Sequence, residues 1–162
     1  MKDKILISLR FSIAVTLLWA IIFLMFINTI GFPEGLAVMY SFAYALGHAC
    51  EFGLALFIVL LLISILPKKL HTIAAIIFSS AGTAFFMADL IIFKQFRLHL
   101  NGGLLTMFFG EGGEEIFVLP VSTYLQAFGG LALIIIVMIG LFFLSYLFRK
   151  RLKKVYFFAY II

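Results

Sequence analysis

The sequence predicts an all-α integral membrane protein, a bundle of four transmembrane helices followed by the start of a fifth. Of its 162 residues, 65% are hydrophobic and 12% are charged, against roughly 45–50% and 25% in an ordinary soluble domain. One water-soluble core of this size cannot enclose so much apolar surface, whereas a bilayer solvates it from outside. Crossing the hydrocarbon core takes about 20 helical residues. Four apolar runs reach that length: about 11–31, 36–66, 70–93 and 119–148.

The first apolar run is expected to be a retained helix and not a cleaved signal peptide. From Phe11 to Ile30 it is 20 residues long, whereas the apolar region of a signal peptide has roughly 7–15 residues. No small-x-small cleavage site follows it. The second run begins after turn-forming residues at 31–35, and the third begins after Pro67 and two lysines. The second and fourth runs are longer than a bilayer crossing needs, so these two helices are expected to be tilted in the membrane.

The break between the third and fourth runs, residues 94–118, is expected to be a periplasmic loop. Pro120 suits the first turn of the fourth helix, because its missing N–H would be unpaired there anyway. After the fourth run come the eight apolar residues 155–162, which span only about 12 Å as a helix. They are expected to begin a fifth helix, with an interfacial tail as the alternative. Residues 1–162 thus form one transmembrane domain.

The distribution of basic residues predicts the orientation in the membrane. The net charge is +5, but Lys and Arg flank the apolar runs, so no nucleic acid partner is expected. If the N-terminus lies inside, only Lys94 and Arg97 of the twelve Lys and Arg residues lie outside. The ten inside are Lys2, Lys4, Arg10, Lys68, Lys69, Arg149, Lys150, Arg151, Lys153 and Lys154. Basic residues collect on the cytoplasmic side, so both ends are predicted to be cytoplasmic.

Two ionisable residues, His48 and Glu51, lie deep in the second run and share a helix face because they are three residues apart. Ionisable groups inside a membrane are costly and call for a partner or a function. Counting residues from the outer ends of the runs places Trp19, Ser79 and Ser80 at a similar depth. These five residues are predicted to form an intramembrane polar cluster. Bridging of helices by hydrogen bonds is the favoured role, and a proton or ion relay is the alternative.

No cofactor, metal ion or catalytic site is expected. The three histidines, His48, His71 and His99, are predicted to lie at three different depths, so no two of them suit a haem. His99 and the acidic residues of 111–115 lack a ligand spacing typical of metal sites. Cys50 is the only cysteine and has no disulfide partner in the chain. Nucleophile-elbow and phosphate-binding glycine motifs are also absent from the sequence.

Charged residues gather where the third run leaves the membrane on the outer side. Asp89 lies about one turn below that end, close to Lys94 and Arg97, and a local ion pair is one interpretation. The other is a site for anionic lipid headgroups made by Lys94, Arg97 and His99. Arg is suited to it because its planar group holds a phosphate in two places, and basic residues at the membrane surface attract acidic lipids.

Two stretches of the sequence resemble a known family. One is residues 40–48, which read YSFAYALGH, and the other runs from Ser80 through Asp89 to the FRLHLN of residues 96–101. Together they resemble the N-terminal membrane domain of the YejM (PbgA) inner-membrane proteins of Gram-negative bacteria. Related lipid-modifying enzymes, including lipoteichoic acid synthases and phosphoethanolamine transferases, share the general layout.

The resemblance implies five transmembrane helices followed by a periplasmic domain of the sulfatase and alkaline phosphatase fold. It implies regulation of lipopolysaccharide synthesis, binding of acidic phospholipid or lipid A, and contact with a membrane adaptor protein that controls proteolysis of a lipid A biosynthetic enzyme. The residues matching the family pattern are His48, Asp89, Arg97, His99 and Asn101, and Asn101 thereby joins the expected lipid site. Glu51 departs from the family pattern, because the resemblance implies an apolar residue at this position.

The leading hypothesis is therefore a non-catalytic domain of the bacterial inner membrane, part of a YejM-like envelope regulator, that binds acidic lipid and partner helices. The alternative is the membrane anchor of a lipid headgroup transferase or phosphohydrolase of the sulfatase and alkaline phosphatase superfamily. A small transporter or channel subunit is a third hypothesis, which rests on His48 and Glu51 alone.

Overall fold

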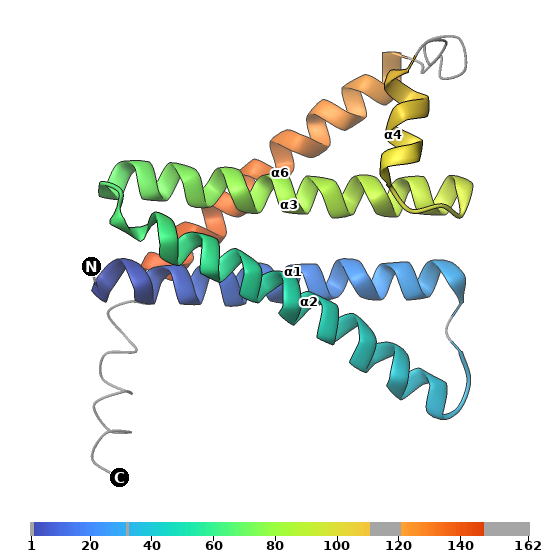
Figure 1. Ribbon diagram of the computed structural model, residues 1–162, viewed down its shortest axis with the longest axis horizontal. Helices are drawn as coiled ribbons and strands as arrows, with labels where there is room; N and C mark the ends of the chain where they lie inside the picture. The colour runs from blue at the N-terminus through green and yellow to red at the C-terminus, as the bar shows by residue number, and fades with distance from the viewer. Residues whose placement is uncertain (1, 32, 111–120, 148–162) are drawn as a thin grey trace.

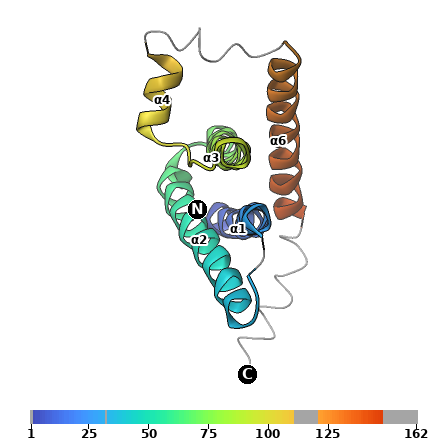
Figure 2. The same ribbon diagram turned by 90° about the vertical axis from the view of Figure 1, so that its right-hand side faces the viewer.

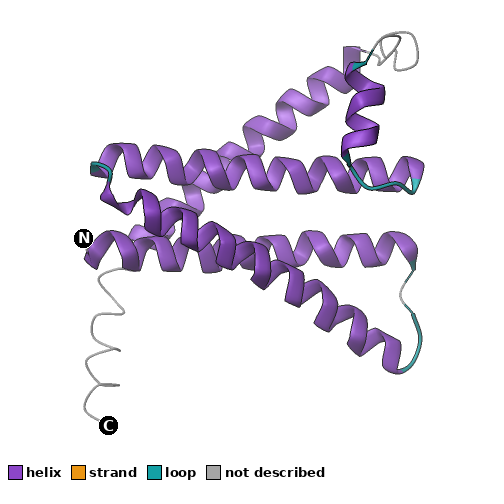
Figure 3. Ribbon diagram, viewed as in Figure 1, coloured by secondary structure: helices purple, strands orange, loops and turns teal. Residues whose placement is uncertain are grey.

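The computed structural model describes residues 2–31, 33–110 and 121–147, and it confirms the predicted all-α class. This described part is helical throughout apart from turns and short connections, and it contains no strand (Figure 3). The elements in chain order are α1 (Lys2–Ile30), α2 (Leu36–Leu62), the short 3-10 helix η1 (Ile63–Ile65), α3 (Lys68–Phe96), α4 (Gly102–Phe109) and α6 (Val121–Leu147).

Four of these helices, α1, α2, α3 and α6, are long and apolar enough to cross a membrane. Their outward surfaces carry exposed leucine, isoleucine and phenylalanine side chains along their whole length. Hydrocarbon offers no partner to backbone N–H and C=O groups, so each spanning segment satisfies them internally as a helix. The four helices are therefore those expected of an integral membrane domain.

The observed boundaries differ from the expected ones at three places. Helix α1 begins at Lys2 and not near residue 11, and α3 continues to Phe96. The expected loop of residues 94–118 contains a further helix, α4, because the apolar residues after Gly102 continue for two turns. Residues 111–120 and the expected start of a fifth helix at 155–162 lie outside the described residues.

Helix α1 is the central helix of the bundle and contacts α2, α3 and α6. Its buried apolar residues recur every three or four positions, which places them along one side of the helix. They are Ile7, Phe11, Val15, Trp19, Ile22 and Phe26. Aromatic contacts join α1 to each of these neighbours, from Phe11 to α6, from Trp19 to α3 and from Phe23 to α2. Figure 2 shows α6 beside α1 and α3, across from α4.

Helices α1 and α2 approach each other closely at one point. Gly53 on α2 lies against the side chain of Thr16, and a Cβ atom at this glycine would collide with the Thr16 hydroxyl oxygen. From there towards the α1–α2 turn, α2 diverges from α1 (Figure 1). The two helices are thus in tight contact over one half of their length and separated over the other half.

Basic residues meet at one end of the bundle. Lys4 on α1 donates hydrogen bonds from Nζ to the carbonyl oxygens of Ser64, at 2.9 Å, and Leu66, at 2.6 Å. The Nζ atom of Lys68 lies 5.0 Å from the ring centre of Tyr146, near the end of α6. The start of α1, the α2–α3 turn and the end of α6 therefore lie together, and the turn that follows α1 lies at the opposite end (Figure 1).

Replacing Gly53 by alanine is expected to weaken the α1–α2 contact. The added methyl group overlaps the Thr16 side chain, and overpacking of this kind costs about 1–3 kcal/mol. Thermal unfolding of the purified protein in detergent measures the effect, and Gly53→Ala should lower the midpoint.

The matched control is Gly47→Ala on the same helix, because nothing lies within 4 Å of a Cβ atom built there. This control should leave the midpoint unchanged or raise it, since alanine favours the helix over glycine. Adding Thr16→Ala to Gly53→Ala should restore part of the loss. Equal midpoints for the Gly53 and Gly47 variants would contradict the close approach.

Candidate functional site

The site centres on the end of α3 that adjoins the turn after α1, called here the outer rim. Helix α3 ends at Phe96, and Arg97 follows it in the left-handed conformation with φ 56°. The backbone N–H of Arg97 donates to the carbonyl oxygen of Phe93 at 3.0 Å. This conformation ends the helix and turns the chain back along α3. Glycine usually occupies such a position, because a side chain there costs energy.

Asp89 holds the turned-back chain against α3. Its carboxylate contacts Nδ1 of His99 at 2.9 Å and also accepts a hydrogen bond from the backbone N–H of Leu100. Its side chain is 14% exposed, whereas that of His99 is 63% exposed. The His99 ring also stacks on Phe93, with ring centres 4.6 Å apart. Asp89 is therefore a structural anchor for the segment that links α3 to α4.

Arg97 connects α3 to α1. Its Nη1 atom donates to the carbonyl oxygen of Thr29 at 2.9 Å, in the last turn of α1. Carbonyl groups in the last turn of a helix lack intrahelical partners, and a cation is favourable there because of the helix dipole. The guanidinium carbon also lies 6.0 Å from the ring centre of Phe93. These contacts of the guanidinium group offset the cost of the left-handed conformation at Arg97.

The expected ion pair between Asp89 and Lys94 or Arg97 is therefore wrong. Asp89 contacts His99 instead, because the turn at Arg97 brings the chain back over Asp89 and directs the arginine towards α1. Lys94 is exposed in the last turn of α3. The carbonyl oxygen of Asn101 accepts from Leu105 at 3.0 Å at the start of α4. Lys94, Arg97, His99 and Asn101 thus lie along one short stretch at the outer rim.

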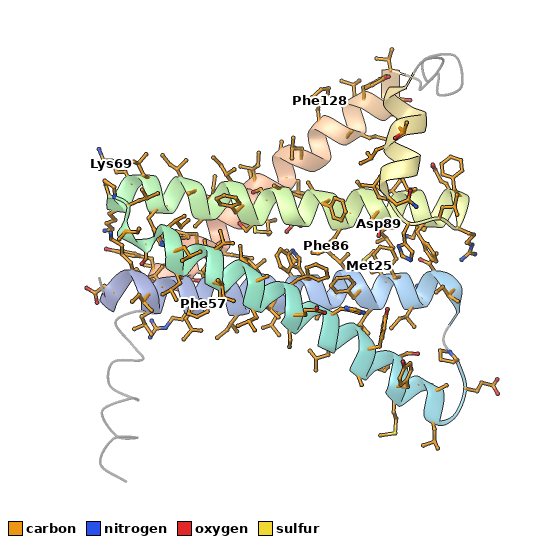
Figure 4. All side chains as sticks on the ribbon, viewed as in Figure 1. Met25, Phe57, Lys69, Phe86, Asp89 and Phe128 are labelled. Atoms are coloured by element: carbon orange, nitrogen blue, oxygen red, sulfur yellow. The ribbon has the colours of Figure 1, made fainter. Side chains whose placement is uncertain are left out.

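Below the outer rim, the divergence of α2 leaves a pocket of about 500 Å³ between α1, α2 and α3. Its walls are mainly aromatic, and Figure 4 shows Phe86 directed from α3 into the space between α3 and α1. The lining residues are Phe23, Phe26, Ile27, Ile30, Tyr44, Ala45, His48, Glu51, Phe52, Phe85, Phe86, Asp89, Phe93 and His99. A smaller hollow of about 280 Å³ adjoins it and shares Ile27, Ile30 and Tyr44.

The aromatic rings contact one another in a continuous series from the middle of the bundle to the outer rim. The ring of Phe86 lies 5.1 Å from Trp19, 5.1 Å from Phe23 and 4.9 Å from Phe52, measured between centroids. Such pairs contribute about 0.5–1.5 kcal/mol beyond their buried area. These rings fill the inner part of the space between the diverging helices, and the pocket is the part that remains open.

The predicted polar cluster of five residues is wrong in its partners. Trp19 donates from Nε1 to Thr83 Oγ1 at 2.8 Å, and Thr83 donates in turn to the carbonyl oxygen of Ser79 at 2.8 Å. The Ser79 hydroxyl donates to the carbonyl oxygen of Ala75 at 2.8 Å, one turn earlier on its own helix. In the described part of the chain, the buried Ser80 hydroxyl has no hydrogen-bond partner. Counting residues along each run identified the helices that carry polar residues at this depth. It did not show which way each side chain faces around its helix axis.

His48 and Glu51 form a separate pair on α2. The Nδ1 atom of His48 lies 3.3 Å from a carboxylate oxygen of Glu51, and the two side chains are 36% and 73% exposed. The His48 ring meets the edge of Tyr44, with centroids 4.3 Å apart. Both residues line the pocket and do not reach the Trp19–Thr83 hydrogen bond. The divergence of α2 explains this separation.

A further polar contact, at the opposite end of the bundle, was not predicted. The Ser8 hydroxyl and Nε2 of His71 lie 3.0 Å apart, and both residues are buried. Ser8 lies one turn after Lys4, so both project towards the α2–α3 turn from one face of α1. The four-residue spacing of Lys4 and Ser8 is visible in the sequence and was a signal from which this contact could be predicted. Among the residues that the structure describes, no three His, Cys, Asp or Glu side chains are grouped to hold a metal ion.

Four spanning helices, basic residues gathered at one end and an aromatic pocket between α1, α2 and α3 define a polytopic helical membrane domain. The chain belongs to the family described as domain of unknown function (DUF3413), whose model matches residues 1–159. Comparison with curated proteins gives no match.

Removing the acceptor of the Trp19 hydrogen bond is expected to destabilise the bundle. Thr83→Val keeps the shape of the side chain but leaves the buried indole N–H unpaired. The cost should be about 1 kcal/mol, since hydrogen bonds between membrane helices average about 0.6 and reach about 1.7 kcal/mol. Trp19 is the only tryptophan, so its fluorescence reports the change directly, and its emission should shift to shorter wavelength.

Thr83→Ser retains the hydroxyl and is the matched control, with emission at the wild-type wavelength. Thr72→Val controls for the loss of a threonine elsewhere on α3, because Thr72 bonds only within its own helix, to the carbonyl oxygen of Lys68. Unchanged emission in Thr83→Val would show that Trp19 does not bond to Thr83.

Proposed function

We propose that this chain is a non-catalytic domain of the bacterial inner membrane, with a cytoplasmic N-terminus, that binds acidic lipid and partner helices. The resemblance of residues 40–48 and 80–101 to YejM-like envelope regulators supports this proposal. By that resemblance the domain acts in the control of lipopolysaccharide and outer-membrane lipid homeostasis. Family membership supports a membrane role, since the matched region contains all four spanning helices.

The observation that carries the lipid proposal is the position of Arg97. Its guanidinium group lies at the outer rim between the ends of α1 and α3, and Lys94 is exposed in the last turn of α3. The contact with Thr29 uses one nitrogen, Nη1, whereas a guanidinium group carries five N–H donors in a planar fork. An arginine held at the membrane surface in this way suits the phosphate group of a lipid. Lys94 adds a second positive charge.

The proposal of partner helices rests on α6. In its described residues only Met138 and Ser145 are buried, and Phe128 points away from the bundle in Figure 4. Gly129 and Gly130 lie on the same half of α6, with nothing within 4 Å of an added Cβ atom. Small residues allow close approach of two membrane helices. A membrane adaptor protein is the kind of partner that the family resemblance implies.

The proposed orientation is supported by the basic residues at one end of the bundle. Lys4 and Lys68 come from different helices and both lie at that end, and basic residues favour the cytoplasmic side. In a Cys50→Ala background, a membrane-impermeant thiol reagent added from outside should label Gly112→Cys and spare Lys69→Cys. Lys69 is suited to this test because it is exposed and points away from the bundle (Figure 4). The reverse labelling pattern would refute the orientation.

The lipid proposal is tested by substituting Arg97. Arg97→Gly removes the side chain and adopts the left-handed conformation without strain, so the fold should be retained. Arg97→Lys keeps the charge but loses the planar fork. Both variants should reduce retention of phosphatidylglycerol relative to phosphatidylcholine in native mass spectrometry. For Arg97→Gly the reduction should be roughly fivefold, because attraction to acidic lipid is worth about 1 kcal/mol per basic residue. Arg97→Lys should reduce the retention nearly as much, because it loses the contact of the planar fork with the phosphate.

Lys69→Ala is the matched control, because it removes one basic residue at the other end of the bundle and should leave this ratio unchanged. If Arg97 acts only as the link to Thr29, Arg97→Ala should lower thermal stability without changing lipid selectivity. Unchanged phosphatidylglycerol retention in Arg97→Gly would refute the acidic lipid site.

A further inference from the structure

The pocket below the outer rim combines aromatic walls with two carboxyl groups from different helices. Glu51 comes from α2 and Asp89 from α3. The Glu51 side chain is 73% exposed, although it lies in a membrane-spanning helix, and within the described residues its ion-pair partner is His48. Charges inside a membrane are costly without a partner. The surroundings of Glu51 therefore favour a ligand that supplies positive charge or hydrogen-bond donors.

Each of the two carboxylates faces Nδ1 of a histidine. This contact determines whether the other ring nitrogen, Nε2, donates a hydrogen bond to a ligand or accepts one from it. Asp89 lies 2.9 Å from Nδ1 of His99, and Glu51 lies 3.3 Å from Nδ1 of His48. A proton on Nδ1 leaves Nε2 of a neutral imidazole as an acceptor. The pocket thus carries carboxylate oxygens and imidazole nitrogens that accept hydrogen bonds, and a ligand with several N–H donors is complementary to it.

The aromatic walls favour a cation among such ligands. The rings of Phe23, Phe52 and Phe86 lie within 4.9–6.0 Å of one another, measured between centroids, and line the inner part of the pocket. Phe85 lines it with half of its side chain exposed. Cations are attracted to the faces of aromatic rings, and the attraction increases when water is excluded.

In the orientation proposed above, Glu51 lies at the depth of the outer leaflet. Its neighbour Phe52 stacks on Phe23, which lies seven residues, or about 10 Å, before the end of α1 at Ile30. Helix α1 has 29 residues and is about 43 Å long, whereas the hydrocarbon core is about 30 Å thick. If both ends extend equally, Glu51 lies only a few ångströms below the outer hydrocarbon boundary.

We propose that this pocket binds the primary ammonium headgroup of a lipid of the phosphatidylethanolamine type, which enters from the outer leaflet between α1 and α2. The ammonium group lies against Glu51 and the faces of Phe52 and Phe86, and its N–H groups donate to Glu51 and to Nε2 of His48. A primary ammonium group has three donors to offer, whereas a quaternary one has none. The pocket borders the outer rim, where His99 lines it, but ammonium binding at Glu51 does not depend on binding of acidic lipid at Arg97.

Native mass spectrometry of the full chain, with phosphatidylethanolamine and phosphatidylcholine of identical acyl chains at equal mole fraction, tests the proposal. The wild-type protein should retain phosphatidylethanolamine preferentially. Glu51→Gln keeps the shape of the side chain and removes its charge, and it should reduce the preference at least about tenfold, as expected for loss of a desolvated charge contact. Phe85→Leu should reduce it by a smaller factor.

Glu34→Gln is the matched control, because it makes the same change at an exposed residue in the α1–α2 turn, outside the pocket lining. It should leave the preference unchanged. Trp19 fluorescence at the wild-type wavelength establishes that each variant is folded. Equal retention of the two lipids by the wild-type protein, or an unchanged preference in Glu51→Gln, would overturn the proposal.

Free ethanolamine and free choline distinguish a lipid from a soluble amine as the ligand. Ethanolamine at millimolar concentration should displace phosphatidylethanolamine partially and choline should not, which supports recognition of the ammonium group. If free ethanolamine binds as tightly as the lipid does, the proposal that the ammonium group belongs to a lipid is overturned. Displacement by choline equal to that by ethanolamine would overturn recognition through N–H donors.

Discussion

The close contact of α1 with α2 is the constraint on which the rest of the structure depends. Gly53 brings the α2 backbone against Thr16, which fixes the point where the helices meet. Because α2 diverges from that point towards the outer rim, side chains must fill a widening space (Figure 1). Phenylalanine rings from three helices fill its inner part. The outer part stays open as the pocket, so the pocket is a consequence of this helix crossing.

The outer rim depends on a backbone conformation that is costly for arginine. The left-handed conformation of Arg97 ends α3 and brings His99 over Asp89. The cost is offset by contacts of the same residue, from Nη1 to the Thr29 carbonyl oxygen and from the guanidinium group to Phe93. A glycine would form the turn without strain but would not link α3 to α1. The Arg97 side chain therefore links the end of α3 to the end of α1.

Polar residues within the spanning helices serve two different purposes. Trp19, Thr83 and Ser79 satisfy one another and the backbone, so they hold α1 and α3 together in the middle of the bundle. His48 and Glu51 face a pocket instead and are more exposed. Glu51 is also the residue that departs from the family pattern that the sequence resembles. A carboxyl group at this position in a membrane-spanning helix is costly, and this cost supports the proposal of a ligand in the pocket.

The sequence by itself determined the fold class and the four spanning helices that the structure describes, because hydrocarbon requires long apolar segments with internally bonded backbones and composition reveals these directly. It also located Asp89, Arg97 and His99 at one helix end, and the basic residues at helix ends. Tertiary structure alone decided which polar groups meet. Residue counting gives depth along a helix but neither its rotation nor its tilt, so Trp19 was assigned to His48 although it bonds to Thr83. The partner of Asp89 likewise depends on the turn at Arg97, a conformation that residue preference argues against and long-range contacts stabilise.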